Sequence, residues 1–572
     1  MRSVAQTEPS PSLVPAATAR GVFGAVVSPH HLASQAGVAI LRAGGSAVDA
    51  AIATNAALSV VASYACGLGG DAFWLIWPGE DSRRDTDAAA VTEAPRLHAL
   101  NGSGRSAAGA TLRAALAQGL EAMPIDGPWT VTVPGAVRSW GDAHGRFGRL
   151  PWADLLAPAI ELAAGFPASP TWLEHVEAGA ATFGMASDFS RVFRPHGRAW
   201  RVGEPVALPS LGRTLRRLAD AGPDDAYEGE LASSAAAYLG AAGSQVGRSD
   251  LAGHASTWAD PIGTTYRGVE SWTHPPNSCG AVALELLNVL ETFDPPGREA
   301  FGPLGVTDAR WVHLGLEAAR HTLADRDTHL TDPDAMAPGA LETMLGRAHA
   351  AELASRIDPR KAGLIPGPAW LAGGGTVYLA TVDRWGGAAS LIESNYRGFG
   401  SGLVDPETGI AYQNRGCFFS LDPRSPNVLA PQKRTFHTLT PGMLFRDGRP
   451  WIVHGSMGGE IQPQVLAQFV SAVVDGSLDI ATAVAAPRWV TGVEARGGAP
   501  ALTRLEGGMD PAVGETLAAM GHRVAWSPPF DSAFGHEHAI EFCWDEGERS
   551  GGRPASYAAT ADPRSEGLPA AL

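Results

Sequence analysis

Cysteine is scarce in this 572-residue sequence, and its positions exclude the structures that cysteines usually build. Cys66, Cys279, Cys417 and Cys543 are scattered and never form a CxxC pair. This spacing argues against a zinc site made of cysteines and against a disulfide scaffold. It is typical of a reducing compartment, so we expect a cytoplasmic protein.

Long apolar runs and lysines are also missing. No stretch of about 18 uninterrupted apolar residues occurs, so we expect no membrane span. Lysine is found only at Lys361 and Lys433, and the formal net charge is −16, which disfavours a Lys-rich membrane patch and a nucleic-acid surface. With 45% hydrophobic and 18% charged residues, the chain is neither mainly disordered nor fibrous.

The first part of the chain predicts a tail followed by two helices. Residues 1–23 have no signal-peptide core and indicate a flexible tail, with folded structure from residue 24. Apolar residues recur at helical spacing between Leu32 and Ile40. Ser46 then stands three residues before Asp49, which predicts a capping box at the start of a second helix.

The pattern changes from helical to strand-like at residue 376. Residues 150–330 indicate mostly helices, and the end of the following polar region, about 360–375, predicts an exposed linker. Two alternating runs, 376–382 and 388–394, then predict a hairpin around a turn at 383–387.

A third pattern joins a strand at 451–455, a glycine-rich turn at 456–460 and a helix that starts near Pro463. Such a junction leaves several backbone N–H groups pointing in one direction. They can bind a carboxylate, a phosphate or a developing oxyanion. A plain tight connection between strand and helix explains the segment equally well.

The pair Gly375–Thr376 has a distinctive chemical option. A threonine hydroxyl is a weak nucleophile unless a base lies beside it. Cleavage before Thr376 would supply that base, because the freed α-amino group has a pKa of about 7.7–8.0. Most Gly–Thr pairs that open a strand are merely structural, so the pair alone decides nothing.

Together, the ordered motifs resemble the γ-glutamyltransferase family of self-cleaving N-terminal-nucleophile hydrolases. The resemblance covers about residues 24–567 and implies an α/β (α+β) fold, a four-layer αββα sandwich. It also implies that segments 24–375 and 376–572 interleave in one core and that no metal or organic cofactor is needed. The motifs are SPHHLASQAG (28–37), GGSAVDAAI (44–52), GLGG (67–70), VTVPGA (131–136), RFGRLP (146–151), TVYLATVD (376–383), FGSG (399–402), GSMGG (455–459) and ADPR (561–564).

The resemblance also implies roles for individual residues. Thr376 would be the nucleophile both for cleavage after Gly375 and for catalysis, and Ser394 would be its supporting hydroxyl. Gly458 and Gly459 would form the oxyanion hole. The family's asparagine matches Asn395 if one residue is inserted and Tyr396 if none is.

Several positions depart from the family pattern. Phe418 stands where γ-glutamyl enzymes have an acidic residue for the substrate ammonium group, and Ser103 stands where they have an arginine. A ring cannot neutralise an ammonium ion. The family's paired serines correspond to His437 and Thr438.

The segments SLIESNYRGFGSG (390–402) and QNRG (413–416) are more similar to a divergent branch that contains cephalosporin (glutaryl) acylases and oxamate amidohydrolases. Its acyl groups are carboxylates without an α-amine, which Arg415 or Arg105 could bind. Two structural alternatives remain: Ser394 as an ordinary strand hydroxyl, and Arg415 paired with a surface carboxylate.

Other candidate residues favour structural roles. His30–His31 and the segment 535–538 lack the spacing of a metal site and predict capping and packing histidines. Cys417 has no histidine pattern beside it, so we expect a small buried apolar side chain.

We therefore expect an amidohydrolase or acyltransferase that cleaves γ-glutamyl-like or small acyl amides, with hydrolysis favoured over transfer because the connection 420–437 is short. Its partners would be the small-molecule substrate and its own two subunits, and a homo-oligomer is compatible with the sequence. The alternative from another class is an uncleaved, catalytically silent family member that binds a small molecule. Metal-dependent hydrolysis is a third reading.

Overall fold

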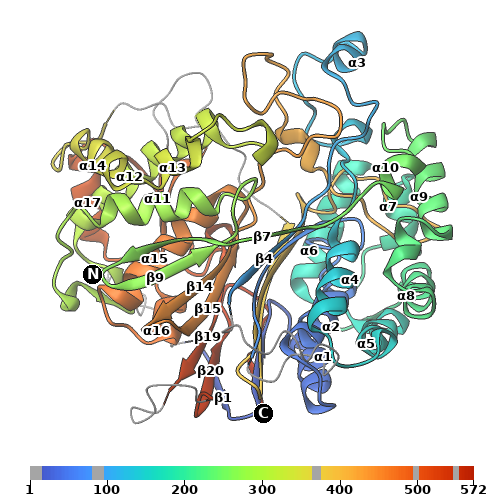
Figure 1. The fold of residues 1–572 in the computed structure, drawn as a ribbon, viewed down its shortest axis with the longest axis horizontal. Coiled ribbons are helices and arrows are strands. Elements are labelled where there is room, and N and C mark those ends of the chain that lie inside the picture. Colours follow the sequence, from blue (N-terminus) through green and yellow to red (C-terminus); the bar gives the residue numbers. More distant parts are fainter. Residues whose placement is uncertain (1–15, 80–95, 364–374, 494–501, 545–552) are drawn as a thin grey trace, which may run out of the picture.

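Two seven-stranded antiparallel sheets form the centre of the computed structural model, which describes residues 16–79, 96–363, 375–493, 502–544 and 553–572 (Figure 1). One sheet has the order β1 (Thr18–Gly21), β20 (Ser556–Thr560), β19 (His536–Cys543), β15 (Arg449–Met457), β14 (Pro441–Arg446), β9 (Val269–Thr273) and β8 (Ile262–Tyr266). The other has the order β21 (Ala570–Ala571), β2 (Gly24–Val27), β12 (Gly375–Asp383), β13 (Ala388–Tyr396), β3 (Asp71–Trp77), β4 (His98–Gly102) and β7 (Thr257–Ala259).

Helices cover the outer face of each sheet, so the molecule has four layers (Figure 1). Beside the β12 sheet lie α1 (His31–Arg42), α2 (Ala47–Val61), α4 (Ala136–Phe147), α5 (Trp152–Ala164), α6 (Pro170–Phe183), α7 (Asp188–Phe193), α8 (Pro209–Ala221), α9 (Glu230–Ala241) and α10 (Arg248–Ala252), and α3 (Leu112–Ala117) lies at the top of the view in Figure 1. Beside the β15 sheet lie α11 (Gly280–Leu290), α12 (Ala309–His329), α13 (Ala340–Met344), α14 (Arg347–Ser355), α15 (Gln462–Val474), α16 (Ile480–Ala485) and α17 (Pro511–Ala519). The expected αββα architecture is confirmed.

Strand alternation builds this layering, because successive side chains on a strand point to opposite faces. On β12, Val377 and Leu379 pack in the core under the helices, whereas Tyr378 and Ala380 pack in the core between the sheets. Both sheets contain strands from before and after residue 375. The two segments therefore share one core.

Most of the predicted local elements are present. Ser46 and Asp49 form the reciprocal capping box of α2, and the hairpin, the helix predicted between Leu32 and Ile40 and the strand–turn–helix segment lie as expected. The predicted linker is described only up to residue 363, and its remainder before Gly375 lies outside the described residues.

One expectation about extended structure needs correction. β1 lies inside the predicted flexible tail, because residues 18–21 pair with β20 more than 500 residues later in the sequence. Region 150–330 is mostly helical, as expected, and it also supplies the short strands β7, β8 and β9 to the two sheets. Short strands that pair with distant partners leave little periodic signal in their own sequence.

Small sheets complete the fold: β5 (Phe166–Pro167) with β6 (Pro205–Val206), β10 (Phe301–Gly302) with β11 (Gly305–Val306), and β16 (Trp489–Val493) with β17 (Leu502–Glu506) and β18 (Arg523–Ser527).

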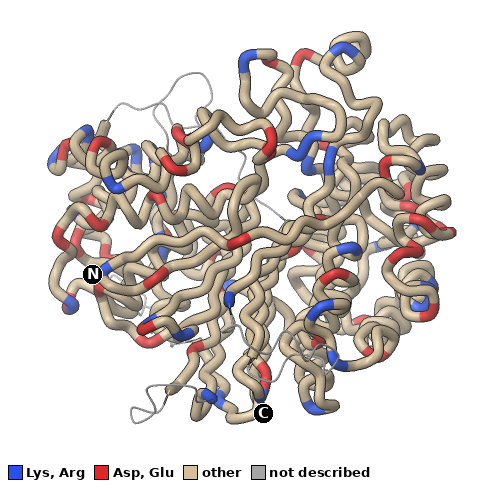
Figure 2. The backbone as a smooth tube through the Cα atoms, in the orientation of Figure 1, with Lys and Arg blue, Asp and Glu red and all other residues tan. Residues whose placement is uncertain are grey.

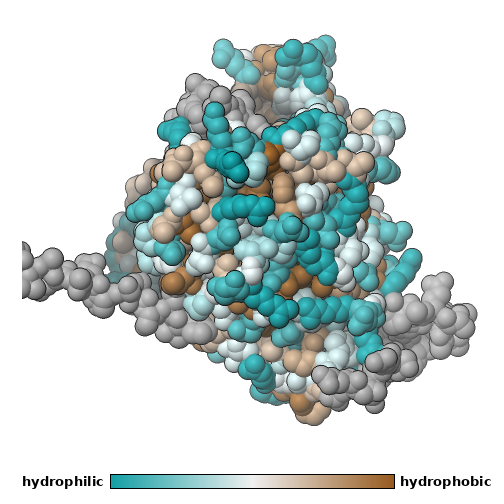
Figure 3. All heavy atoms as spheres, turned by 90° about the vertical axis from the view of Figure 1, so that its left-hand side faces the viewer, coloured by the Kyte–Doolittle hydropathy of each residue, from teal (hydrophilic) through white to brown (hydrophobic). Residues whose placement is uncertain are grey.

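Charges of both signs are distributed over the outside of the molecule (Figure 2). On the side shown in Figure 3, hydrophilic residues are mixed with small apolar patches. Within the part of the chain that the structure describes, no helix combines the length and the apolar character that crossing a membrane requires.

Candidate active site

Two hydroxyl groups and a carbonyl form a continuous hydrogen-bonded chain at the start of β12. Thr376 and Ser394 are cross-strand partners on β12 and β13. The Thr376 hydroxyl donates to Ser394 Oγ at 2.9 Å, and Ser394 Oγ donates to the Gly375 carbonyl at 2.6 Å. The Tyr396 N–H also donates to Ser394 Oγ, at 2.7 Å. Ser394 thus connects the Thr376 hydroxyl with the peptide bond that precedes it.

The strand pattern explains why these groups meet. Thr376 has the same strand parity as Tyr378, and Ser394 has that of Ile392, so both hydroxyls lie on the side that faces the second sheet. A side chain at position 375 would place its Cβ 2.8 Å from the Tyr64 carbonyl oxygen. This close approach requires glycine before Thr376.

Arg415 lies against this pair of hydroxyls and is 1% exposed. Its Nη2 donates to Ser394 Oγ at 3.3 Å and its Nη1 to Thr438 Oγ1 at 3.2 Å, while its Nε has no hydrogen-bond partner among the described residues. The guanidinium lies 4.7 Å from the ring centroid of Tyr396 and 5.3 Å from that of Phe418.

No carboxylate of the described residues forms an ion pair with Arg415. Burial lowers the pKa of Arg415, and the more distant charge of Asp71 opposes that shift. The buried guanidinium is therefore able to receive an anionic group beside Thr376. The alternative that it pairs with a surface carboxylate is not what the structure contains.

Asp71 is a buried carboxyl group that the sequence did not single out. It is the cross-strand partner of Ser394 on β3. Its Oδ1 accepts the N–H groups of Gly104 and Gly135 at 3.0 and 3.3 Å, and its Oδ2 lies 3.3 Å from His437 Nε2. Burial raises the pKa of Asp71 to about 7, against the opposing effects of Arg415 and the two amides.

His437 is held neutral beside Asp71, because burial lowers its pKa well below the usual value. Its Nδ1 accepts the Leu439 N–H at 3.4 Å, which leaves Nε2–H to donate to Asp71. A second missed carboxyl, Glu393, accepts Asn55 Nδ2 at 2.5 Å and the Gly67 N–H at 2.9 Å, and burial raises its pKa to about 8. Only the position of Asp71 directly after the GLGG loop gave a signal in the sequence.

The turn with Gly458 and Gly459 connects β15 to α15. Both glycines have positive φ values, 144° and 59°, which residues other than glycine rarely adopt. The neighbouring Glu460 carboxylate is paired with Arg326 Nη1 at 2.9 Å. The turn therefore has the backbone conformation expected of an anion-binding junction.

The other predicted site residues fall into two groups. Asn395 is buried, and neither polar atom of its side-chain amide has a hydrogen-bond partner. Tyr396 has a φ of 73°, and its ring lies 4.5 Å from that of Phe418. These residues, with Thr438, adjoin Arg415 or Ser394.

Arg105 is placed differently. It is paired with Asp332 at 2.7 Å and Asp334 at 3.4 Å, and it lines a cavity of about 440 Å³ together with Arg434 and His254. The hydroxyls of the Thr376 pair do not line that cavity. Arg105 is already engaged by carboxylates, unlike Arg415.

His30, His538 and Cys417 have surroundings typical of structural residues. His30 Nδ1 accepts the Leu32 N–H at 3.2 Å and caps α1, and His538 Nδ1 accepts the Asp562 N–H at 3.0 Å. Cys417 is half-buried rather than fully buried. Burial raises the pKa of its thiol to about 12, so it is not a thiolate nucleophile near neutral pH.

Two sheets between helical layers, with a hydroxyl pair at the start of a central strand, are the architecture of an N-terminal-nucleophile hydrolase. The family model for gamma-glutamyltranspeptidase matches residues 33–572, and the chain belongs to this family. It is an enzyme of the γ-glutamyltransferase-like type.

Individual relatives support this assignment. The chain is 37% identical over 544 residues to the "Glutathione hydrolase-like YwrD proenzyme" of Bacillus subtilis (95% of this chain, 97% of the relative). It is 36% identical over 525 residues to the "Oxamate amidohydrolase proenzyme" of Klebsiella pneumoniae (90% and 94%). The solved structure of a cephalosporin acylase from Bacillus halodurans matches with a TM-score of 0.86 at 34% identity and covers 100% of this chain and 99% of that chain.

Proposed function

We propose that this protein is a self-processing amidohydrolase whose nucleophile is the hydroxyl of Thr376, freed as an N-terminal residue by cleavage after Gly375. The observation that supports this most directly is the hydrogen-bonded chain from the Thr376 hydroxyl through Ser394 to the Gly375 carbonyl. It places the proposed nucleophile and the bond to be cut in one network. The relatives named as proenzymes are consistent with processing.

The proposed reaction uses groups of this chain only. After processing, the Thr376 α-amino group takes the hydroxyl proton while Oγ1 attacks the substrate amide carbon. Backbone N–H groups of Gly458 and Gly459 stabilise the oxyanion. The leaving amine departs with a proton, and water then hydrolyses the acyl-enzyme ester and regenerates Thr376.

Arg415 supports a substrate whose acyl group carries a carboxylate but no α-amino group. The buried guanidinium has a free Nε and no carboxylate partner in the described residues. Near it, Phe418 packs between Tyr396 and Phe436 at ring distances of 4.5 Å and 4.5 Å, so this wall offers rings rather than a carboxylate to an ammonium group. Glutaryl and oxamate-like amides fit this chemistry, and transfer to an amine acceptor is the minor outcome.

Denaturing electrophoresis and a substrate pair test the proposal. Wild-type protein should yield fragments of 375 and 197 residues, T376A should stay full length and inactive, and T376S should still process because it keeps the hydroxyl. Glutaryl-p-nitroanilide should be hydrolysed faster than γ-glutamyl-p-nitroanilide.

The outcomes separate the alternatives. A wild type that stays undivided and inactive supports the silent binding protein. Processing with a preference for the γ-glutamyl substrate would keep Thr376 but refute the role of Arg415. Activity that is lost in chelator would instead support metal-dependent hydrolysis.

A further inference from the structure

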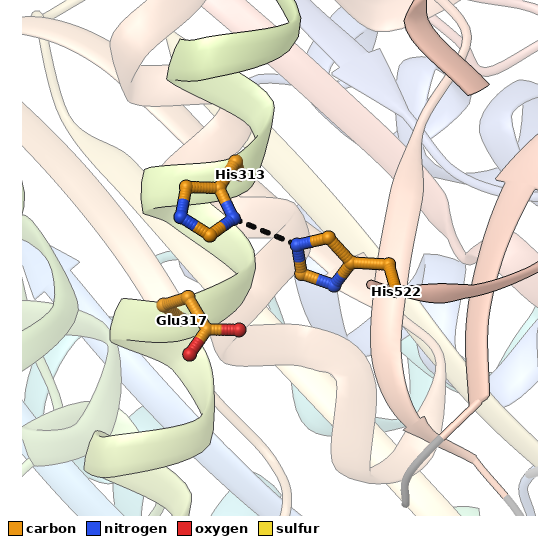
Figure 4. A group of neighbouring side chains, drawn as sticks. All are labelled: His313, Glu317 and His522. Atoms are coloured by element: carbon orange, nitrogen blue, oxygen red, sulfur yellow. Dashed lines mark hydrogen bonds between the residues drawn. The ribbon is translucent and has the colours of Figure 1, made fainter. Parts of the chain in front are cut away.

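Two groups of histidine and carboxylate side chains lie away from Thr376, in the helical part of the molecule beside the β15 sheet. One consists of His313, Glu317 and His522 (Figure 4), and the other of Glu285, Asp325 and His349. In each group the nitrogen and oxygen atoms lie within 4.8 Å of one another, which is close enough for a shared metal ion. The two groups differ in how their polar atoms are satisfied.

The first group is closed by hydrogen bonds. His313 Nδ1 and His522 Nε2 are 2.7 Å apart, as the dashed line in Figure 4 marks, and His313 Nε2 donates to the Asp358 carbonyl at 2.8 Å. Arg320 hydrogen-bonds to His522 Nδ1 at 3.2 Å and pairs with Glu317. The positive charge of Arg320 already lies against His522 and Glu317, so it would repel a metal ion at this position.

The second group leaves a carboxylate unsatisfied. Glu285 on α11 is 0% exposed, and neither of its carboxyl oxygens has a hydrogen-bond partner within the part of the chain that the structure describes. The nearest cationic candidate is His349 Nε2, at 3.4 Å from Glu285 Oε1, and that nitrogen is closer to Asp325 Oδ2, at 2.6 Å. Ionising a buried carboxyl group without donors is costly, and the carboxylate of Asp325 beside it adds repulsion, so the pKa of Glu285 is well above its usual value.

We propose that Glu285, Asp325 and His349 bind a divalent transition-metal ion of the Zn²⁺ type. Two carboxylate oxygens and one imidazole nitrogen are ligands that Zn²⁺ accepts, with water as a fourth ligand. The ion's double charge would balance the two carboxylates. The side chains of Asp325 and His349 are 19% and 18% exposed, so an ion can enter from solvent.

The ion would join three helices. Glu285 lies on α11, Asp325 on α12 and His349 on α14, and these helices lie together in one outer layer (Figure 1). α14 is the last described helix before the proposed cleavage segment. The proposed metal site is therefore structural: it would hold α14, near the end of segment 24–375, against α11 and α12. The ion takes no part in the proposed reaction.

Zinc binding to the purified full-length protein tests this site. The protein is dialysed against chelator, gel-filtered, and given ZnCl₂ alone; bound zinc is counted by elemental analysis and Tm is followed by calorimetry. We expect one bound zinc per chain and a rise in Tm of about 3 °C. MgCl₂ should give no shift, because Mg²⁺ prefers an octahedral set of oxygen ligands.

Two substitutions and one matched control locate the ion. E285Q keeps the side-chain shape, and H349N removes the imidazole; each should weaken zinc binding about tenfold or more. H196N removes an exposed histidine outside the group and should bind zinc as the wild type does. In chelator, E285Q should melt near the wild-type Tm, because Glu285 without a metal ion is a neutral carboxyl group of nearly the same shape as glutamine.

Either of two results overturns the proposal. One is a wild type that holds no zinc after gel filtration. The other is unchanged zinc binding in both E285Q and H349N, which would place the ion elsewhere. Since H349N alters a partly exposed residue, it decides the question even if E285Q fails to fold.

Discussion

Two buried arginines in this molecule have opposite surroundings. Arg564 follows β20 and is paired with Glu506 at 2.6 Å and with Asp562 at 3.0 Å. Burial opposes its charge, but the two carboxylates outweigh burial and raise its pKa. Arg415 is equally buried, has hydroxyls and aromatic rings around it, and has a lowered pKa.

The difference separates an arginine whose charge is balanced by carboxylates from one whose charge is not. Carboxylates that saturate a buried guanidinium fix the fold, because each charge would be costly alone. A guanidinium that lacks them keeps its capacity for an anion from outside. Arg415 therefore has the surroundings expected of a substrate-binding group, which Arg105 and Arg564 lack.

Substituting methionine for each arginine should give the largest difference between the two sites, in stability for one and in activity for the other. R564M leaves buried carboxylates without their partner and should destabilise the protein by about 3–5 kcal/mol. R415M removes an unpaired charge and should leave Tm nearly unchanged, but it should lower kcat/KM for a glutaryl amide about 100-fold. Thermal melting and steady-state kinetics measure the two effects.

R415K is the control, because it retains the charge without the planar fork and should recover part of the activity. A large loss of Tm in R415M would show that Arg415 is a structural arginine like Arg564.

The second largest effect is expected from the titration of Asp71, whose carboxyl group lies in the electrostatic field of Arg415. In the folded protein burial raises its pKa to about 7, whereas an unfolded aspartate has a pKa of about 3.9. Between these values the folded state holds a proton that the unfolded chain has released. The contribution to stability is full below the lower value and is lost as pH rises through about 7, by up to about 1.4 kcal/mol per pH unit.

D71N does not titrate, so the Tm of wild type minus that of D71N should fall between pH 5 and pH 8. Calorimetry at four pH values measures this trend. A flat difference would mean that Asp71 stays ionised throughout, stabilised by Arg415.

The smallest effect on activity is expected when a carboxylate is introduced beside Arg415. Such a carboxylate would give Arg415 a charged partner of the kind that Arg564 has. In F418D the new carboxylate should pair with Arg415 and reduce glutaryl-p-nitroanilide hydrolysis about tenfold. The relative rate for γ-glutamyl-p-nitroanilide should rise, since its ammonium group gains a partner. F418L, which changes the ring but adds no charge, is the control, and an equal change of both rates in F418D would contradict the pocket.

The fold was predictable where its signals are local. The capping box of Ser46 and Asp49, the hairpin that starts at Thr376 and the strand–turn–helix around Gly458 all depend on residues within a few positions of one another. The layered architecture came from the family resemblance. The pairing of β1 with β20 was missed, because its partners lie at opposite ends of the chain.

The candidate site was predictable only in part. Thr376 and Ser394 follow from ordered motifs, and their hydrogen bond agrees with that expectation. Asp71 was missed, because a lone aspartate after a glycine loop resembles an ordinary turn residue. Its significance depends on burial opposite Ser394, which no spacing in the sequence encodes.

The sequence by itself determined the periodic elements, the glycines at strained turns and the threonine that follows Gly375, since these depend on short-range sterics and chain chemistry. Only the tertiary structure decided which charges are compensated. Among the residues that the structure describes, Arg415 has no paired carboxylate and Glu285 has no hydrogen-bond donor because of how distant segments pack. The energetic cost of a buried charge and its capacity to bind a ligand both depend on its neighbours in space.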